Sequence, residues 1–131
     1  MNAQNNTADA ELRIGWATED ITPSGPVSLY GQYYERISLY VQSALTITAC
    51  AIEKKDATGN AEQAITVSMD VIYALKEVQD AVRERVKDKL PGFDVRKLFL
   101  NATHTHSAPY PEVGGTFGQL LLDGICKAVI T

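Results

Sequence analysis

Both histidines of this chain lie in one short segment, His104-Thr105-His106, where the strand-like run 97–102 gives way to turn residues. Side chains alternate along an extended chain, so His104 and His106 are expected to point to the same side and to act together. Neutral imidazole is a good ligand for zinc and other transition metals. A catalytic zinc normally has three protein ligands and a water molecule, so this spacing alone predicts only part of a metal site.

Other polar and aromatic side chains near this segment have competing interpretations. Ser107 could be a nucleophile, although a Ser-Ala-Pro turn explains it more simply. Asp70 ends an apolar strand and is expected either to hold an imidazole in one tautomer or to cap the following helix. Tyr30, Tyr33 and Tyr34 are expected to pack within their loop rather than to line a lipid-facing opening.

Hydrophobic periodicity predicts the elements that must position the histidines. Alternating and β-branched runs predict strands over 12–17, 37–53, 64–70 and 97–102. Helical spacing predicts amphipathic helices over 72–90 and 116–131, although Gly118 and Gly124 disfavour the second. The strand-helix-strand step over 64–102 fits a right-handed parallel crossover. The expected fold is therefore α/β, with a mixed β-sheet and flanking helices.

Composition and charge exclude some classes of function. The chain has 131 residues, which suits one domain or a piece of a larger one. A net charge of -4 and a pI near 5.1 argue against binding to nucleic acid or to an anionic membrane. No apolar run is long enough for a transmembrane segment.

The two ends of the chain and its cysteines carry further expectations. Residues 1–11 are polar and linker-like or disordered, and they fit either a cytoplasmic start or a linker left after removal of a signal peptide from an exported protein. The last apolar periodic segment stops without a cap, so residues 12–131 are expected to be the incomplete N-terminal part of a larger catalytic domain. Cys50 and Cys126 are expected to be buried free thiols, with a disulfide as the alternative.

Four segments, 14–23, 29–33, 67–70 and 100–109, together resemble the N-terminal part of the neutral/alkaline (non-lysosomal) ceramidase family. The most specific is Leu-Asn-Ala-Thr-His-Thr-His-Ser-Ala-Pro over 100–109, which is close to the family motif Ala-Thr-His-Thr-His-Ser-Gly-Pro. The resemblance covers nearly all of this chain but only the first part of such an enzyme.

The resemblance implies hydrolysis of an amide (N-acyl) bond at a single zinc ion, with a small-molecule or lipid amide as substrate. It implies that His104 is a zinc ligand, and that His106 lies beside the metal as a catalytic and substrate-binding residue. The remaining ligands in the family are a histidine, a glutamate and a tyrosine from further along the chain. This chain alone is therefore expected to have an incomplete zinc site and to be inactive.

The sequence departs from the family motif in the loop that borders the substrate. Ala108 replaces a glycine, and the four residues 110–113 separate Pro109 from Gly114-Gly115. In the family the glycines follow the proline closely, so amides or esters other than ceramide are alternative substrates.

Two other classes of function remain as alternatives. A His-x-His metal hydrolase of another class is one, but metallo-β-lactamases need a further Asp-His after the pair, and amidohydrolase barrels place the pair on their first strand. The other is a non-catalytic binding or assembly domain.

Overall fold

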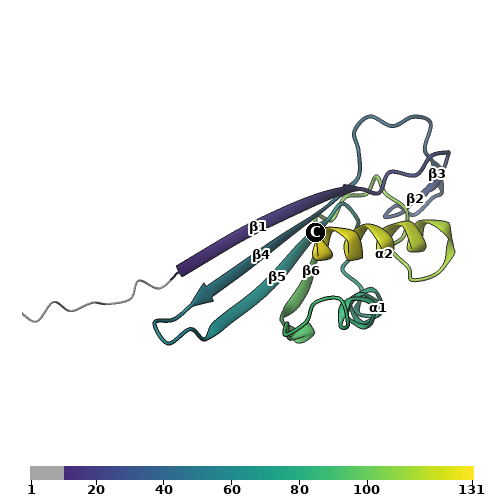
Figure 1. Ribbon diagram of the computed structural model, residues 1–131. Helices are drawn as coiled ribbons and strands as arrows, with labels where there is room; N and C mark the ends of the chain where they lie inside the picture. Colours follow the sequence, from purple (N-terminus) through teal and green to yellow (C-terminus); the bar gives the residue numbers. More distant parts are fainter. Residues whose placement is uncertain (1–10) are drawn as a thin grey trace, which may run out of the picture.

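A computed structural model describes residues 11–131, which form one four-stranded sheet, a two-stranded hairpin and two α-helices (Figure 1). The large sheet has the order β1-β4-β5-β6, with β1 (Glu11–Asp20), β4 (Thr46–Lys55), β5 (Ala61–Met69) and β6 (Leu98–Ala102). The hairpin consists of β2 (Ser28–Leu29) and β3 (Arg36–Ile37). The helices are α1 (Lys76–Val86) and α2 (Gly115–Ile130), and a 3-10 turn (Val95–Lys97) precedes β6.

The first residues of the chain were expected to be a linker over 1–11. Residues 1–10 lie outside the described part of the chain, and Glu11 is the first residue of β1.

The large sheet is mixed, as the sequence predicts. The pairs β1–β4 and β4–β5 are antiparallel, whereas β5 and β6 run parallel, with Val67 opposite Leu100 and Met69 opposite Ala102. Helix α1 lies in the connection between β5 and β6, so the expected parallel crossover is confirmed. The parallel pairing places the ends of β5 and β6 side by side at one edge of the sheet.

The prediction of a long strand over 37–53 is wrong for its N-terminal part. β4 starts only at Thr46, opposite Asp20 of β1. Ile37 belongs to β3, and residues 38–45 form a loop. Pro23 lies three residues after Asp20 and has no N–H to donate, so the neighbouring strand cannot continue alongside 37–45. Leu39 is consequently 90% exposed instead of being packed in a sheet.

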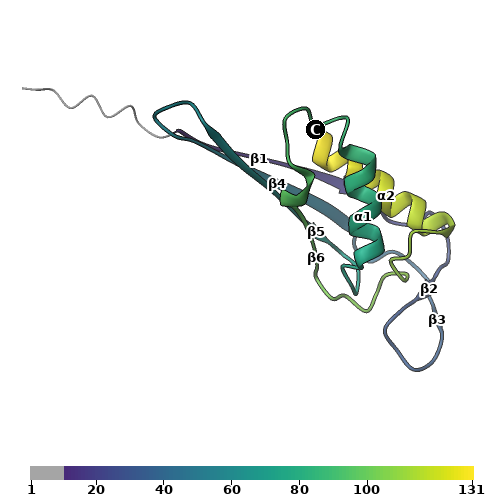
Figure 2. The ribbon, with the colours of Figure 1, turned by 90° about the horizontal axis from the view of Figure 1, so that it is seen from below.

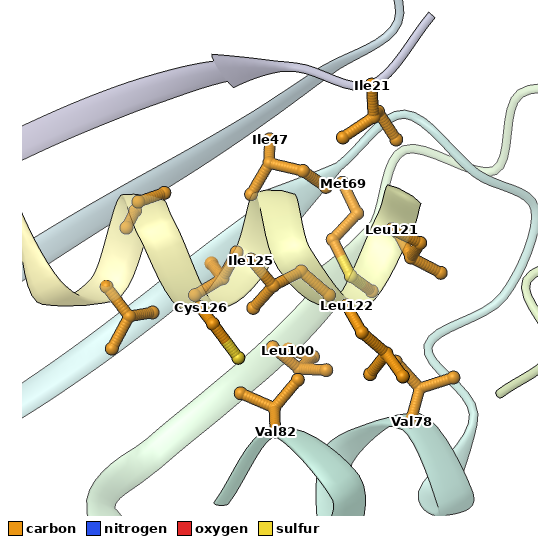
Figure 3. Packing of buried hydrophobic residues seen from close by; sticks show 14 of the residues in the cluster. Ile21, Ile47, Met69, Val78, Val82, Leu100, Leu121, Leu122, Ile125 and Cys126 are labelled. Atoms are coloured by element: carbon orange, nitrogen blue, oxygen red, sulfur yellow. The ribbon is translucent and has the colours of Figure 1, made fainter. Parts of the chain in front are cut away.

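Both helices cover the same face of the sheet (Figure 2). Alternate residues of β4, β5 and β6 point toward them and are buried, as a period of two requires. The close packing between strand and helix side chains is visible in Figure 3. The buried cluster includes Ile47, Val67, Met69 and Leu100 from the sheet, Val78 and Val82 from α1, and Leu121, Leu122 and Ile125 from α2. No helix within residues 11–131 has the length and apolarity that a membrane span needs.

The opposite face of the sheet has no covering layer among the described residues. Its apolar side chains on β1 are open to solvent, with Leu12 61%, Ile14 55% and Trp16 76% exposed. Among residues 11–131, the sheet is therefore covered on one side only (Figure 2).

Both cysteines are free thiols. Cys126 is buried, and its burial raises the pKa of the thiol, whereas Cys50 is only half-buried. The prediction of unpaired thiols is confirmed, and that of full burial holds for Cys126 alone.

The glycines of α2 disfavour a helix by propensity, but packing explains two of them. A Cβ on Gly124 would lie 2.5 Å from Cγ2 of the buried Ile21. A Cβ on Gly118 would overlap the carbonyl oxygen of Glu112 and would lie 2.9 Å from the carbonyl carbon of Val113. Gly118 therefore lets the helix pack directly against the backbone of residues 112–113. This backbone leads out of the segment 103–109, called the histidine loop below.

We expect Gly118→Ala to lower the free energy of unfolding by about 1–2 kcal/mol. Alanine favours a helix by about 1 kcal/mol over glycine, but overlap with a fixed backbone carbonyl costs more than that gain. Denaturant unfolding of the variant measures the difference. Gly25→Ala is the control, because its added Cβ would meet nothing within 4 Å, and a raised midpoint for Gly118→Ala would contradict the expectation.

Candidate metal centre

His104 lies in a tight turn directly after β6. Its φ of 64° is in the left-handed region, which a non-glycine residue adopts at a cost. Two backbone hydrogen bonds hold the turn against the end of β5 and the segment that follows it, from Thr103 N to Met69 O (3.0 Å) and from His104 N to Val71 O (3.1 Å). The chain is therefore not extended here. The sequence-based expectation that strand alternation would place the two histidines on the same side gives the wrong reason for their arrangement.

The two imidazoles nevertheless lie next to each other. Their ring centroids are 5.0 Å apart, with the rings nearly perpendicular at 80°. The turn at His104, rather than strand alternation, brings them together.

Each imidazole is fixed by a backbone carbonyl. His104 Nδ1 lies 2.8 Å from Ile72 O, and His106 Nδ1 lies 2.9 Å from Gly31 O. A carbonyl oxygen only accepts hydrogen bonds, so Nδ1 carries the proton in both neutral rings and the lone pair is on Nε2. A carbonyl partner on the second nitrogen is the usual support of a metal-binding histidine. These donors therefore fit a metal ion bound through Nε2.

Asp70 has neither of the two roles expected for it. Its carboxylate accepts hydrogen bonds from the backbone N–H and the hydroxyl of Thr46, both at 2.9 Å. Helix α1 begins at Lys76 and has Leu75 at its N-cap, so Asp70 is too far away to cap it. Asp70 instead ties the end of β5 to the start of β4, and the carbonyl of Ile72 orients the imidazole.

The histidine pair is an incomplete ligand set. Within residues 11–131 no group of three or more His, Cys, Asp or Glu side chains is arranged to hold a metal ion. The pair offers at most two nitrogen donors.

A row of aromatic rings leads from the loops to His104. Tyr73 lies 5.8 Å from the imidazole, Tyr30 lies 6.3 Å from Tyr73, and Tyr110 lies 4.6 Å from Tyr30, all between ring centroids. Sequence analysis missed Tyr73 and Tyr110, because they come from different loops and show no common spacing.

The expectation that Tyr33 and Tyr34 pack within their loop is wrong. Tyr34 is 67% exposed, and Tyr33 is fully exposed. Only Tyr30 of the three joins an aromatic cluster.

The turn after the histidines is closed by a threonine. The backbone N–H of Ser107 donates to Thr105 Oγ1 at 3.2 Å. A side-chain hydroxyl therefore closes this turn, but it is the hydroxyl of Thr105 and not that of Ser107.

A large hollow lies elsewhere in the structure. It has a volume of about 550 Å³ and lies between the outer ends of β1, β4 and β5, the loop at Leu90–Phe93 and the end of α2. None of its lining residues belongs to the histidine loop, so it is not part of the candidate centre.

Similarity to solved structures gives this geometry a context. The structure of neutral ceramidase from Pseudomonas aeruginosa matches with a TM-score of 0.76 and 24% identity, over 92% of this chain and 21% of that chain. A structure described as ceramidase complexed with C2 matches with a TM-score of 0.65 and 26% identity, over 92% of this chain and 20% of that chain. No protein-family model matches this sequence. No curated protein matches it either.

The chain spans about a fifth of the length of the ceramidase structures that it matches. Within that part, the strands and helices follow the same path over nearly the whole of the chain. The chain therefore has a neutral ceramidase-like α/β fold.

Proposed function

We propose that residues 12–131 form the first part of a zinc-dependent amide hydrolase similar to neutral ceramidase. In this proposal His104 is a metal ligand, and His106 lies beside the metal as a catalytic and substrate-binding residue. The fold supports a ceramidase-like hydrolase. The histidine pair supports the finer assignment of roles.

One observation carries the metal proposal: both Nδ1 atoms are engaged by backbone carbonyls. The ring of His104 therefore presents the unprotonated Nε2, the form that a metal needs, without a change of tautomer. The strained backbone at His104 is consistent with this role, because residues held in sparsely populated conformations cluster at functional sites.

His106 is suited to act on a substrate beside the metal. Its neutral Nε2 can accept a proton or a hydrogen bond, and its ring lies 5.0 Å from that of His104. A bound zinc ion would supply Lewis acidity toward the scissile carbonyl and toward water. The role of His106 is then to bind the reacting group and to assist the transfer of its proton.

The remaining metal ligands would come from polypeptide other than residues 11–131. Two imidazoles fall short of the three protein ligands that a catalytic zinc normally has. The chain corresponds to about a fifth of the matched ceramidases, so a further histidine, a glutamate and a tyrosine in the rest of such an enzyme would complete the site.

The aromatic row favours a substrate with an apolar portion. Tyr30, Tyr73 and Tyr110 are each about 40% exposed, and their rings form a row that begins beside His104. Aromatic rings offer large apolar contact surfaces with a polar edge, as an N-acyl amide requires. Tyr110 belongs to the segment 110–113 that the family motif lacks, so this substrate-bordering loop is where the preference would differ from ceramide.

We expect zinc to bind to this chain weakly and at His104 Nε2. Titration of zinc into the chain with ¹⁵N-labelled histidine, followed by NMR, should shift the Nε2 resonance of His104 before any other imidazole nitrogen. His104→Ala should remove the zinc-dependent changes at His106. Cys50→Ser should leave the titration unchanged, which excludes the thiol of Cys50, the more exposed of the two cysteines, as the ligand. An unshifted His104 in the wild-type chain would contradict the metal proposal.

In the hydrolase that contains this segment, we expect both histidines to be needed for cleavage of an N-acyl amide. His104→Ala should abolish both zinc content and hydrolysis. His106→Ala should retain zinc while lowering the rate by about 10²–10⁴-fold, the usual contribution of a general acid or base. Elemental analysis and release of the fatty acid measure the two effects. Absence of zinc from the whole protein would favour a non-catalytic binding domain instead.

A further inference from the structure

The β2–β3 hairpin contacts the histidine loop at three points. The backbone N–H of Tyr30 donates to Ala108 O (2.9 Å), the carbonyl of Gly31 accepts from His106 Nδ1 (2.9 Å), and Arg36 Nη2 donates to the carbonyl of His106. Two of these three hydrogen bonds are made with His106 itself.

Gly31 is the closest neighbour of the His106 ring in this hairpin. A Cβ at this position would lie 2.7 Å from His106 Nδ1 and 2.9 Å from its Cγ, and it would also meet Ile72 Cδ1 at 2.8 Å. Its φ of 102° is a conformation that residues with side chains rarely adopt. The backbone at Gly31 therefore serves as both the hydrogen-bond partner and the packing surface of the imidazole.

Arg36 holds the backbone of His106, whereas Gly31 contacts its imidazole ring. Its guanidinium donates to the carbonyl oxygen of His106, and within the described residues its buried Nε has no hydrogen-bond partner. Leaving a buried donor of a charged group unpaired costs free energy. The hydrogen bond from Nη2 to the carbonyl of His106 offsets part of that cost.

The two histidines are held by different parts of the chain. His104 is bonded through its backbone N–H to Val71 and through its ring to Ile72, both in the connection that follows β5. His106 is bonded to Gly31 and Arg36 of the hairpin. A change in the hairpin should therefore displace His106 more than His104.

We propose that the hairpin over 28–37 is the positioning element for His106, with Gly31 and Arg36 as positioning residues. The hairpin fixes His106 in its Nδ1–H tautomer and sets the distance of its Nε2 from the ligand nitrogen of His104. This inference rests on the proposed function only for the catalytic role of His106. The placement of His106 is a property of this chain.

The test is NMR of ¹⁵N-labelled histidine at a pH where both imidazoles are neutral. In the wild-type chain both rings should show the Nδ1–H tautomer. Gly31→Ala should remove the Nδ1–H signal of His106 and give a mixture of tautomers. His104 should change less, because the added Cβ reaches it only through the side chain of Ile72. The exposed neighbour in the same loop provides the control, because Gln32→Ala should leave both rings as they are.

Arg36 provides a second set of variants if alanine at Gly31 prevents folding of the hairpin. Arg36→Met keeps most of the apolar stem but removes the donors, and it should shift the His106 resonances alone. Arg36→Lys keeps a positively charged donor and should restore much of the wild-type spectrum.

An unchanged His106 in both Gly31→Ala and Arg36→Met would overturn the proposal. Equal disturbance of His104 and His106 would also overturn it, because the hairpin would then act on the whole turn. Zinc titration of the same variants separates this from the proposed function. If zinc shifts the His104 resonance in Gly31→Ala, the metal ligand is intact although His106 is displaced. If zinc leaves the His104 resonance of the wild-type chain unshifted, only the metal role of His104 is refuted.

Discussion

The parallel pairing of β5 with β6 is the constraint on which the histidine turn depends. Because the two strands run in the same direction, the residues that follow them leave the sheet side by side. The carbonyls of Met69, Val71 and Ile72 are therefore available to the chain after β6, which uses all three. An antiparallel β6 would end at the opposite edge of the sheet, and His104 would have none of these partners. The crossover through α1 and its packing on the sheet thus determine where the imidazole lies.

Those three hydrogen bonds also explain how His104 is kept in a left-handed conformation. The conformation costs roughly 1–2 kcal/mol for a residue with a side chain. A typical hydrogen bond within a protein contributes about 0.5–1.5 kcal/mol net, so the bonds made by Thr103 N, His104 N and His104 Nδ1 are together sufficient to offset it. The turn therefore owes its shape to the strand beside it rather than to the local preferences of its own residues.

Much of the fold could be predicted from the sequence, because its elements are amphipathic and have clear periods. The mixed sheet, the crossover and both helices follow from the spacing of buried residues such as Val67, Val78 and Val82. The beginning of β4 could not be predicted from residues 37–45, because it is set by a proline in the neighbouring segment. The histidine pair could be found from residue type and spacing. Its supports could not, since the carbonyls of Ile72 and Gly31 have no side-chain signature and Gly31 is 75 positions away from His106.

Separate supports for the two histidines affect how such a site can diverge. The tip of the hairpin, 32–35, is exposed, and it carries Tyr33 and Tyr34 into solvent. Insertions that change the path of this loop alter the surroundings of His106, yet they leave the strand ends that hold His104 untouched. Under the proposed function, natural variation in this loop would change which molecules are accepted without a loss of metal affinity. Selection would then act on substrate preference and on metal retention independently.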